Sequence, residues 1–359
     1  MNESLSAEQG RLRLGRRQLL AGTGAASAAF ALRGLLQSAP AYAAGASGNL
    51  PSHPRWRFVF VNHVTTNPFF VPTQYGIQDA CGVLGCTYQW AGSETSQVGQ
   101  MVNAMNEAIS AKADGIAVSI IDPTAFNDPV QRALAAGIPV VSYNADAPAS
   151  SHNERLAYLG QDLYVSGVMM GQRIVQLVKS GHVVLFIATP GSLNIQPRID
   201  GAADAIKKSG ASITYEEIAT GPTVNEELSR IDAYYQGHKT VKGMFAVDAG
   251  STQGVGQVMQ KYGLAAQGVH AGGYDLLPTT LQLIKGGHLD FTIDQQPYLQ
   301  GFYPVVELFT YKLSGGLTGP ADCDTGLKFI TKASVDPYLR TQTRFEGSSS
   351  TEKLVQIPK

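Results

Sequence analysis

Short apolar runs alternate along the chain with longer stretches whose apolar residues recur at helical spacing. Residues 58–61 form a continuous apolar run, which is typical of a strand buried on both faces of a sheet. The stretch 96–111 instead places Met101, Met105 and Ile109 on one side of an amphipathic helix. Because a crossover helix covers the sheet beside its two parallel strands, this alternation predicts a parallel, doubly wound sheet with right-handed crossovers.

The same pattern assigns elements as far as residue 330 and none beyond it. The expected strands are 57–64, 87–90, 115–121, 138–143, 156–159, 183–188, 212–218, 243–247, 269–274, 291–294 and 329–330. The expected helices are 71–84, 96–111, 123–136, 164–179, 196–209, 225–235, 250–262, 278–284 and 301–314. The order of strands and helices restarts at 156–159, so we predict an α/β protein with two doubly wound parallel-sheet lobes.

Length and charge narrow the class of protein. The chain has 359 residues, which is enough for two domains of ordinary size. No apolar run reaches the roughly 18 residues that a membrane-spanning helix needs. The 27 basic and 28 acidic residues give a net charge of −1. Because phosphate binding needs a basic face, this balance argues against nucleic acid as the main partner.

The first 43 residues have the features of a targeting segment. Arg16 and Arg17 precede a weakly apolar run rich in Ala and Gly, and residues 41–43 form a small-x-small cleavage site. The segment resembles a twin-arginine export signal, with a generic secretion signal as the alternative. Either signal places the mature protein outside the cytoplasm, on the periplasmic or the extracellular side. A flexible lead is expected at 44–54, which is rich in Ala, Gly, Ser and Pro.

The chain has three cysteines, Cys81, Cys86 and Cys323. Export permits disulfides, and Cys81 and Cys86 lie between a helix end and the next strand. Both a short-loop bridge and a pair of buried free thiols remain open. No histidine or further cysteine lies at ligand spacing, so we predict no metal site.

Polar and aromatic side chains follow several of the expected strands. In an open parallel sheet the carboxyl ends of the strands are where ligands bind. The residues at these positions are His63, Asn67, Phe69, Phe70, Asn144, Asp146, Asp248, Asp275 and Gln295, and Arg198 lies early in a helix of the second half.

This set of side chains suits a neutral polyol. Carboxylates accept hydrogen bonds from hydroxyl groups, arginine donates to them, and Asn and Gln do either. Phe69 and Phe70 can cover the C–H face of a sugar ring. The alternative for each Asp is a helix N-cap, and for each Phe a place in the core.

Motifs of the common enzyme classes are missing from the sequence. No G-x-G-x-x-G opens a helix after a strand, no Walker loop is present, and no G-x-S-x-G elbow occurs. Gly254 and Gly256 lie within a helical pattern and indicate helix packing. A glycosidase would need paired carboxylates, and the sequence fixes no distance between Asp248 and Asp275. We therefore predict a binding protein without a cofactor and not an enzyme.

Six short motifs in order carry a resemblance to a known family. They are Asn67-Pro-Phe-Phe70, Gly137-Ile-Pro-Val-Val141, Arg198-Ile-Asp-Gly201, Phe245-Ala-Val-Asp248, Gly273-Tyr-Asp275 and Thr292-Ile-Asp-Gln295. From about residue 57 to residue 330 the chain resembles the ribose-binding-protein-like group of periplasmic sugar-binding proteins, the substrate receptors of ABC importers. The resemblance implies the type 1 periplasmic binding protein fold, in which three crossings, here near 156–161, 294–297 and 320–326, join two lobes.

The resemblance also implies boundaries for the parts of the chain. These are the signal at 1–43, the lead at 44–54, an N-terminal lobe at 55–157 plus 296–322, a C-terminal lobe at 158–295 plus 323–331, and a polar tail at 332–359.

Carried over residue by residue, the resemblance assigns roles in the site. Phe69 and Phe70 would sandwich the sugar ring. The residues that would bond its hydroxyl groups are Asn67, Arg198, Asp248, Asp275 and Gln295.

The chain departs from the family's pattern at several positions. Asn144 stands where the family often has Asp, and Ala145 where an Arg often follows, which removes a charge pair unless Asp146 replaces it. Asp248 stands where Asn is common, and His63 where a small hydroxyl residue is common. These departures put ribose itself in doubt. Tyr274 could add stacking, with core packing as the alternative.

The implied function is capture of a monosaccharide or related polyol by a monomer that delivers it to a membrane ABC permease. Two alternatives remain from the same fold: a sugar-sensing receptor for a membrane signalling partner, and a receptor for a non-sugar small molecule. A transcription regulator would need an N-terminal helix-turn-helix where this chain has its export signal.

Overall fold

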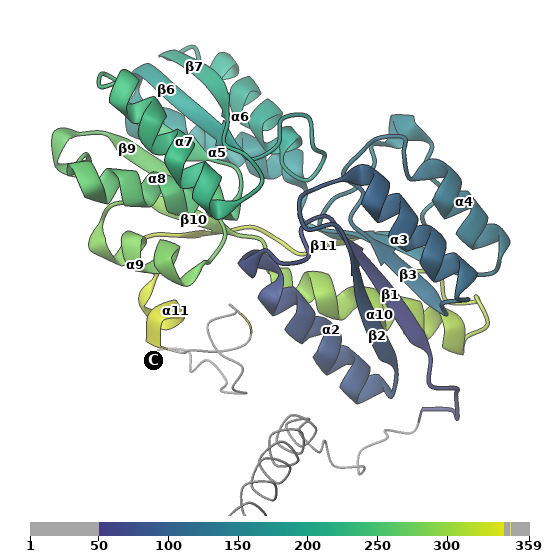
Figure 1. Cartoon of the computed structure of the whole chain (residues 1–359). Coiled ribbons are helices and arrows are strands. Elements are labelled where there is room, and N and C mark those ends of the chain that lie inside the picture. The colour runs from purple at the N-terminus through teal and green to yellow at the C-terminus, as the bar shows by residue number, and fades with distance from the viewer. Residues whose placement is uncertain (1–49, 341–344, 346–359) are drawn as a thin grey trace, which may run out of the picture. The chain divides into compact units, whose positions relative to one another are not determined.

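The computed structural model describes residues 50–340 and 345. The expected signal at 1–43, most of the lead and most of the tail beyond residue 340 lie outside the described residues. From Pro51 onward the chain forms one unit, which contains two six-stranded sheets (Figure 1).

Strands and helices alternate through both halves, as the sequence pattern indicates. The strands are β1 Arg57–Asn62, β2 Thr87–Gly92, β3 Gly115–Val118, β4 Val140–Tyr143, β5 Tyr158–Gly160, β6 Ser180–Ile187, β7 Ser212–Ala219, β8 Gly243–Ala246, β9 His270–Tyr274, β10 Phe291–Asp294, β11 Cys323–Asp324 and β12 Lys328–Ile330. The α-helices are α2 Val71–Leu84, α3 Val98–Ser110, α4 Asn127–Ala135, α5 Leu163–Val178, α6 Gln196–Ser209, α7 Val224–Gly237, α8 Ala249–Tyr262, α9 Pro278–Gly286, α10 Pro297–Leu313 and α11 Asp336–Arg340. Short 3-10 helices lie at η1 Pro68–Phe70, η2 Ala149–Ser151 and η3 Ala265–Gln267.

Each sheet is doubly wound, which confirms the predicted fold class. The strand order is β11-β5-β4-β3-β1-β2 in the first sheet and β12-β10-β9-β8-β6-β7 in the second. All pairings are parallel except that of β12 with β10. The central strands are buried and apolar because helices cover both faces of each sheet.

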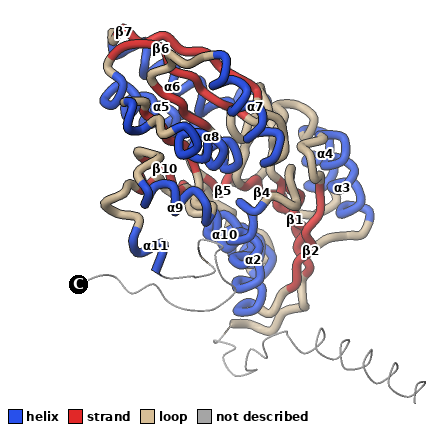
Figure 2. Tube along the Cα trace, turned by 60° about the vertical axis from the view of Figure 1, so that its left-hand side comes forward, coloured by secondary structure: helices blue, strands red, loops and turns tan. Residues whose placement is uncertain are grey.

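The helices divide into two layers around each sheet. In the first lobe α2 and α10 lie side by side on one face, and α3 and α4 cover the other (Figure 2). In the second lobe α7, α8 and α9 share one core, and α5 and α6 another. Gly254 and Gly256 in α8 face Ile231 and Leu283, so the helix-packing interpretation of this glycine pair is confirmed.

The helix expected at 123–136 begins four residues later than its sequence pattern predicts. The stretch 123–136 was expected to be helical throughout, whereas α4 begins at Asn127. The side chain of Asp122 accepts hydrogen bonds from the backbone N–H groups of Thr124 and Ala125, at 2.9 and 2.8 Å. This turn uses the first residues of the expected helix and delays its start.

The chain passes between the sheets three times, at 161–162, 295–296 and 325–327. The restart predicted at 156–159 is wrong, because β5 pairs with β4 in the first sheet. β11 likewise pairs with β5. The expected lobe boundaries after residues 157 and 322 therefore fall one short strand before the change of sheet.

The expectation of no structure after residue 330 is also wrong. α11 lies at residues 336–340 and follows a turn at 332–334 and Val335, which is fully buried. Val335, Tyr338 and Leu339 pack against the core formed by α7, α8 and α9. Because apolar residues recur at 335, 338 and 339, one side of this short helix is buried.

The three cysteines are free thiols in this structure. Cys81 and Cys86 are both buried beside the end of α2, where Gly85 adopts the left-handed conformation with φ of 68°. The neighbouring Cys86 thiol and burial raise the pKa of Cys81.

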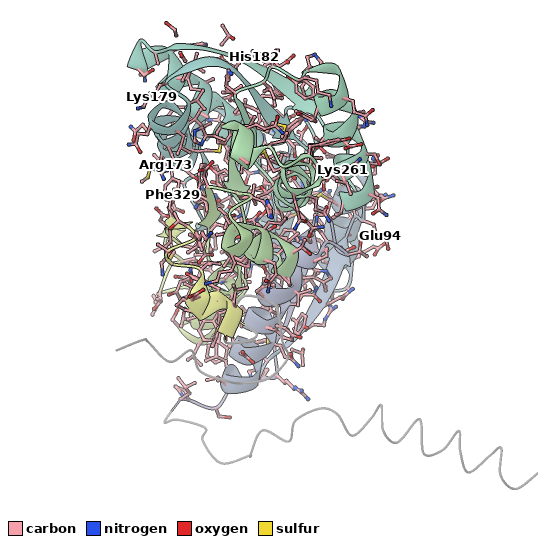
Figure 3. All side chains as sticks on the ribbon, turned by 90° about the vertical axis from the view of Figure 1, so that its left-hand side faces the viewer. Glu94, Arg173, Lys179, His182, Lys261 and Phe329 are labelled. Carbon is pink, nitrogen blue, oxygen red and sulfur yellow. The ribbon has the colours of Figure 1, made fainter. Side chains whose placement is uncertain are left out.

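Charged side chains mostly lie at the surface. Figure 3 shows Lys179 and Lys261 projecting from the second lobe, where both are exposed. In contrast, Arg198 and Asp275 are buried at 2% and 4% exposure. None of the helices in the described part of the chain combines the length and apolarity that crossing a membrane requires.

Candidate ligand-binding site

A cavity of about 60 Å³ lies where the carboxyl ends of strands from both sheets meet. The residues that line it and that the sequence also predicted for the site are His63, Asn67, Phe69, Phe70, Asn144, Arg198, Asp248, Asp275 and Gln295. Nine of the eleven predicted residues thus share one pocket, and the two that do not are Asp146 and Tyr274. Both lobes contribute charged or aromatic groups, so a molecule held there contacts both.

The aromatic wall comes from η1, directly after β1. Asn67 caps this short helix, its side-chain oxygen accepting a hydrogen bond from the N–H of Phe69 at 2.9 Å. Phe69 and Phe70 lie edge to face with ring centroids 4.7 Å apart. That separation leaves no space for a sugar ring between them, because a ring needs about 3.5 to 4 Å on each side. The expected sandwich is therefore wrong here, and the two rings form a single wall.

Arg198 provides the buried positive charge. Its guanidinium donates to the carbonyl of Val247 at 2.8 Å and to the side chain of Gln161 at 3.3 Å. The group lies 4.1 Å from the centroid of the Tyr274 ring, which fixes its plane. Its Nε is buried without a hydrogen-bond partner among the described residues. The bonds to Val247 and Gln161 use two of its five N–H donors, and the side chain also lines the pocket.

Asp275 follows β9 in a left-handed conformation, with φ of 76°. Its carboxylate accepts a 2.7 Å hydrogen bond from the amide of Gln295, which follows β10. Burial raises the pKa of Asp275 to about 7, although Arg198 and the Gln295 amide act in the opposite direction. Such strained backbone and a shifted pKa are typical of functional sites.

Asp248 has two structural roles at once. It is the N-cap of α8, where one oxygen accepts from the N–H of Ser251 at 2.8 Å, and the other accepts from Ala188 at 2.9 Å. The capping alternative is thus confirmed, and the same carboxyl group also lines the pocket.

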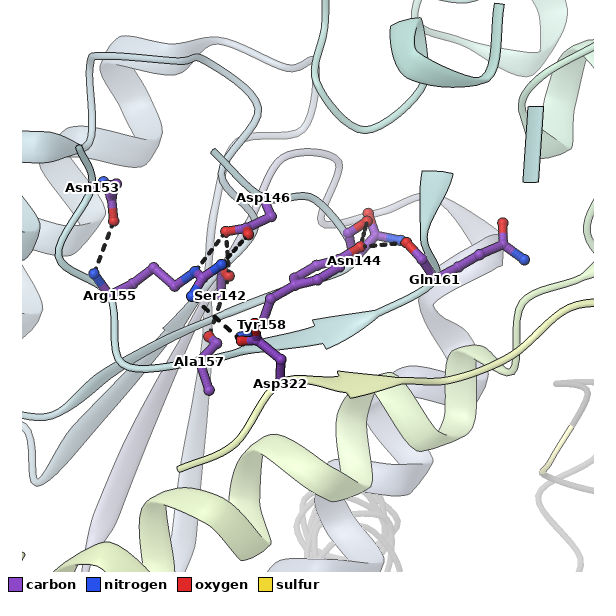
Figure 4. Close-up of polar contacts among 9 residues, drawn as sticks. All are labelled: Ser142, Asn144, Asp146, Asn153, Arg155, Ala157, Tyr158, Gln161 and Asp322. Atoms are coloured by element: carbon purple, nitrogen blue, oxygen red, sulfur yellow. Dashed lines mark hydrogen bonds and ion pairs between the residues drawn. The ribbon is translucent and has the colours of Figure 1, made fainter. Parts of the chain in front are cut away.

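The expected replacement of a missing charge pair by Asp146 does not occur. Asp146 pairs with Arg155 and accepts a 2.7 Å hydrogen bond from Ser142, outside the pocket (Figure 4). Asn144 lines the pocket instead, in a left-handed conformation with φ of 63°. Its amide donates to Gln300 at 3.0 Å. Of these two residues, which lie two positions apart in one turn, Asn144 faces the pocket and Asp146 does not.

Tyr274 lies under the site and does not line it. The side chain is fully buried, and its hydroxyl group hydrogen-bonds Ser166 at 2.7 Å. Its ring supports Arg198 from below. The core-packing alternative for Tyr274 therefore agrees with the structure.

His63 connects the lobes across the pocket. Its Nδ1 lies 2.9 Å from Ser119 Oγ in its own lobe, and its Nε2 lies 3.1 Å from the amide nitrogen of Asn194 in the other. Burial lowers the pKa of His63 to about 3. The imidazole is therefore neutral and acts through hydrogen bonds.

Sequence reasoning missed several polar lining residues. These are Ser96, Thr189, Asn194 and Glu227. Asn194 follows β6 at a distance of seven residues, and a strand-end search that included the whole loop before α6 finds it. Glu227 lies within a helix, where no strand-end signal exists. The described residues contain no group of three or more His, Cys, Asp or Glu side chains able to hold a metal ion.

Two α/β lobes joined by three crossings, with polar and aromatic groups from both around one pocket, define a ligand-binding protein of the two-lobe type. The model of the periplasmic binding protein domain matches residues 58–315. The chain belongs to this family.

Individual relatives agree with that assignment. The chain is 56% identical over 318 residues to the xylose/arabinose-binding protein XylF of Sulfolobus acidocaldarius, covering 85% of this chain and 78% of that protein. It is 25% identical over 209 residues to the D-galactose/methyl-galactoside binding periplasmic protein MglB of Haemophilus influenzae, covering 54% and 62%. These relatives are binding proteins, which confirms the prediction that the chain is not an enzyme.

Solved structures share the fold. A solute-binding protein of an ABC transporter from Burkholderia graminis, in complex with D-arabinose, superposes with a TM-score of 0.72 at 26% identity, covering 79% of this chain and 98% of that one. A carbohydrate transporter from Acidothermus cellulolyticus, in complex with myo-inositol, gives 0.71 at 24% identity, covering 82% and 100%. The second likeness concerns the fold alone.

Proposed function

We propose that this protein is an exported receptor that captures a pentose, or a closely related monosaccharide or polyol, and delivers it to the permease of an ABC importer. The observation that carries the proposal is one buried pocket that combines Arg198, Asp248 and Asp275 with an aromatic wall. The similarity to a xylose/arabinose-binding protein over 85% of the chain supports a pentose.

The chemistry of the pocket suits the hydroxyl groups of a sugar. The carboxylates of Asp248 and Asp275 accept from hydroxyl groups, and the guanidinium of Arg198 donates to them. The ring carbons then lie against Phe69 and Phe70. Because these groups come from two lobes, a bound sugar stabilises the closed arrangement, in which the permease recognises the receptor.

The remaining parts of the assignment rest on sequence. The twin-arginine-like segment at 1–43 supports export to the periplasm or the outer cell surface. The net charge of −1 argues against nucleic acid as the main partner. We expect a monomer, which size-exclusion chromatography with light scattering measures directly.

A thermal-shift screen of the chain from residue 44 onward tests the proposal. The ligands are D-xylose, L- and D-arabinose, D-ribose, D-glucose and myo-inositol. A ligand at about 100 times its Kd stabilises the folded state by about 2.7 kcal/mol, or roughly 4 °C in a chain of this size.

We expect such a shift for at least one pentose and its loss in Arg198→Ala and Asp275→Ala. The matched control is Asp128→Ala, whose carboxylate is exposed on α4 and which should keep the shift. A chain that no sugar or polyol stabilises would contradict the proposal and favour a non-sugar ligand.

A further inference from the structure

One carboxyl group of the pocket has no role in the function proposed above. Glu227 lies in the first turn of α7, which Thr223 caps, and its side chain is 3% exposed while lining the pocket. Its approach depends on Gly250, since a Cβ at that position would lie 1.7 Å from Glu227 Oε2. The fold therefore makes room for this carboxyl group against α8.

The Glu227 carboxyl group has an acid as its neighbour and no cation. Oε2 is buried without a partner among the described residues, and none of the salt bridges found there includes Glu227. Asp248 lines the same pocket, two residues before the Gly250 that Oε2 approaches, and its charge acts on Glu227. Two carboxyl groups that face each other away from water cannot both be ionised, so the pair shares a proton.

The surroundings decide which of the two acids keeps the proton. Asp248 accepts from two backbone N–H groups, those of Ser251 and Ala188, and caps the positive end of α8. Glu227 receives no such donor. Burial and the charge of Asp248 raise the pKa of Glu227 to about 10, and Glu226 beside it on α7 adds to this shift. Arg198 and Asp275 are the other charged groups lining the pocket.

We propose that Glu227 is a positioning residue of the ligand site, held as a neutral acid that donates a hydrogen bond to Asp248 and directs that carboxylate toward a ligand hydroxyl group. The inference rests on the proposed sugar-binding function. It adds a residue from a helix to a site otherwise built from strand ends. A proton on Glu227 also leaves the pair with a single negative charge, which a neutral sugar tolerates.

The pH profile of sugar affinity tests the proposal, with Glu227→Gln as the informative variant. Its amide donates to Asp248 at every pH, so affinity at pH 7 should stay within about threefold of the wild type. Between pH 8 and 10.5 the wild type should weaken about fourfold as Glu227 loses its proton, given its pKa of about 10. Glu227→Gln should show no such loss. Circular dichroism at each pH checks that the chain remains folded.

Two results would overturn the assignment. One is an alkaline loss of equal size in Glu227→Gln, and the other is a tenfold or larger loss in that variant at pH 7 while it remains folded. A second measurement needs no sugar: the infrared difference between wild type and Glu227→Gln should contain a protonated carboxyl band at pH 7. In Asp248→Asn that band should disappear at lower pH than in the wild type, because the neighbouring charge is gone.

An absent band contradicts the neutral acid whatever the ligand. A band without sugar binding by the wild type contradicts the proposed function and, with it, the positioning role. The two failures are thus told apart.

Discussion

The side chains of His63 and Asn194 join the two lobes through a 3.1 Å hydrogen bond. An amide nitrogen can only donate, so Nε2 of His63 must be the acceptor and the ring must be neutral. Nδ1 then carries the proton and donates to Ser119 Oγ at 2.9 Å. Beside this contact the N–H of Leu193 donates to the carbonyl of Ile121 at 3.0 Å, also from one lobe to the other. The side-chain contact between the lobes is therefore made by the unprotonated form of one histidine.

Acid should weaken ligand binding through His63. Burial lowers its pKa from 6.5 to about 3, so its contribution to the closed state is constant above pH 6.5 and is lost as the pH falls toward 3. If the ring titrates normally when the lobes separate, affinity at pH 5 should fall by up to roughly 30-fold relative to pH 7.5. Isothermal titration calorimetry at both pH values measures this change.

The matched variant is His63→Gln, whose amide offers hydrogen bonds to the same neighbours and does not titrate. It should lose less affinity on acidification than the wild type. The residual loss would come from Asp275, whose pKa is about 7. An identical acid response in both proteins would exclude His63 as the sensitive group.

Ionised Asp275 should lower the unfolding free energy of the protein while it contributes to sugar binding. Its folded pKa of about 7 lies above the ordinary value of 3.8, so the protonated folded state is favoured. The stabilisation is complete below pH 3.8 and is lost as the pH rises through 7, which amounts to at most roughly 4 kcal/mol. Asp275→Asn should therefore show a smaller decrease in unfolding free energy between pH 5 and pH 8 than the wild type, measured with urea. It should also lose sugar affinity, and an unchanged pH dependence would contradict the assigned ionisation.

Most of the site follows from one regularity that sequence can reveal. Parallel strands bring their carboxyl ends to one edge, so residues such as Asn67, Asp248 and Gln295 are predictable without knowing any distance. Helix bounds are also recoverable where a glycine ends the helix, as Gly85 and Gly210 do in the left-handed conformation.

The errors arise where the direction of a side chain decides the outcome. Asn144 and Asp146 are two residues apart, and the left-handed backbone at Asn144 turns one side chain into the pocket and leaves the other to pair with Arg155. Glu227 is beyond strand-end reasoning, because only the close approach of α7 to Gly250 brings it to the site. Strand β5 has only three residues, and nothing in their sequence indicates which of the two sheets the strand joins.

Asp146 provides a test of this distinction between neighbouring residues. Asp146→Ala removes the nearer acidic partner of Arg155 and leaves Asp322, 3.4 Å from the guanidinium. The Asp146 and Arg155 side chains are mostly buried, at 17% and 21% exposure. We expect the unfolding free energy to fall by about 1 to 3 kcal/mol, which lies between the losses typical of surface and of buried ion pairs. Sugar affinity should change by less than about threefold, because Asp146 does not line the pocket. Asp275→Ala measured in parallel should instead lose sugar affinity with little loss of stability. A large affinity loss in Asp146→Ala would show that Asp146 belongs to the ligand site.

The position of Arg198 should depend on the glycines at the interface where α5 packs against α6. A Cβ at Gly167 would lie 2.3 Å from the backbone oxygen of Arg198, which is closer than any real contact. Gly167→Ala must therefore push α6 away from α5, and we expect a loss of about 1 to 3 kcal/mol together with weaker sugar binding. Gly99→Ala is the matched control, since nothing lies within 4 Å of a Cβ at that helical position. It should be neutral or stabilise α3 by up to about 1 kcal/mol, with affinity unchanged. Equal effects of the two variants on affinity would show that helix spacing does not position Arg198.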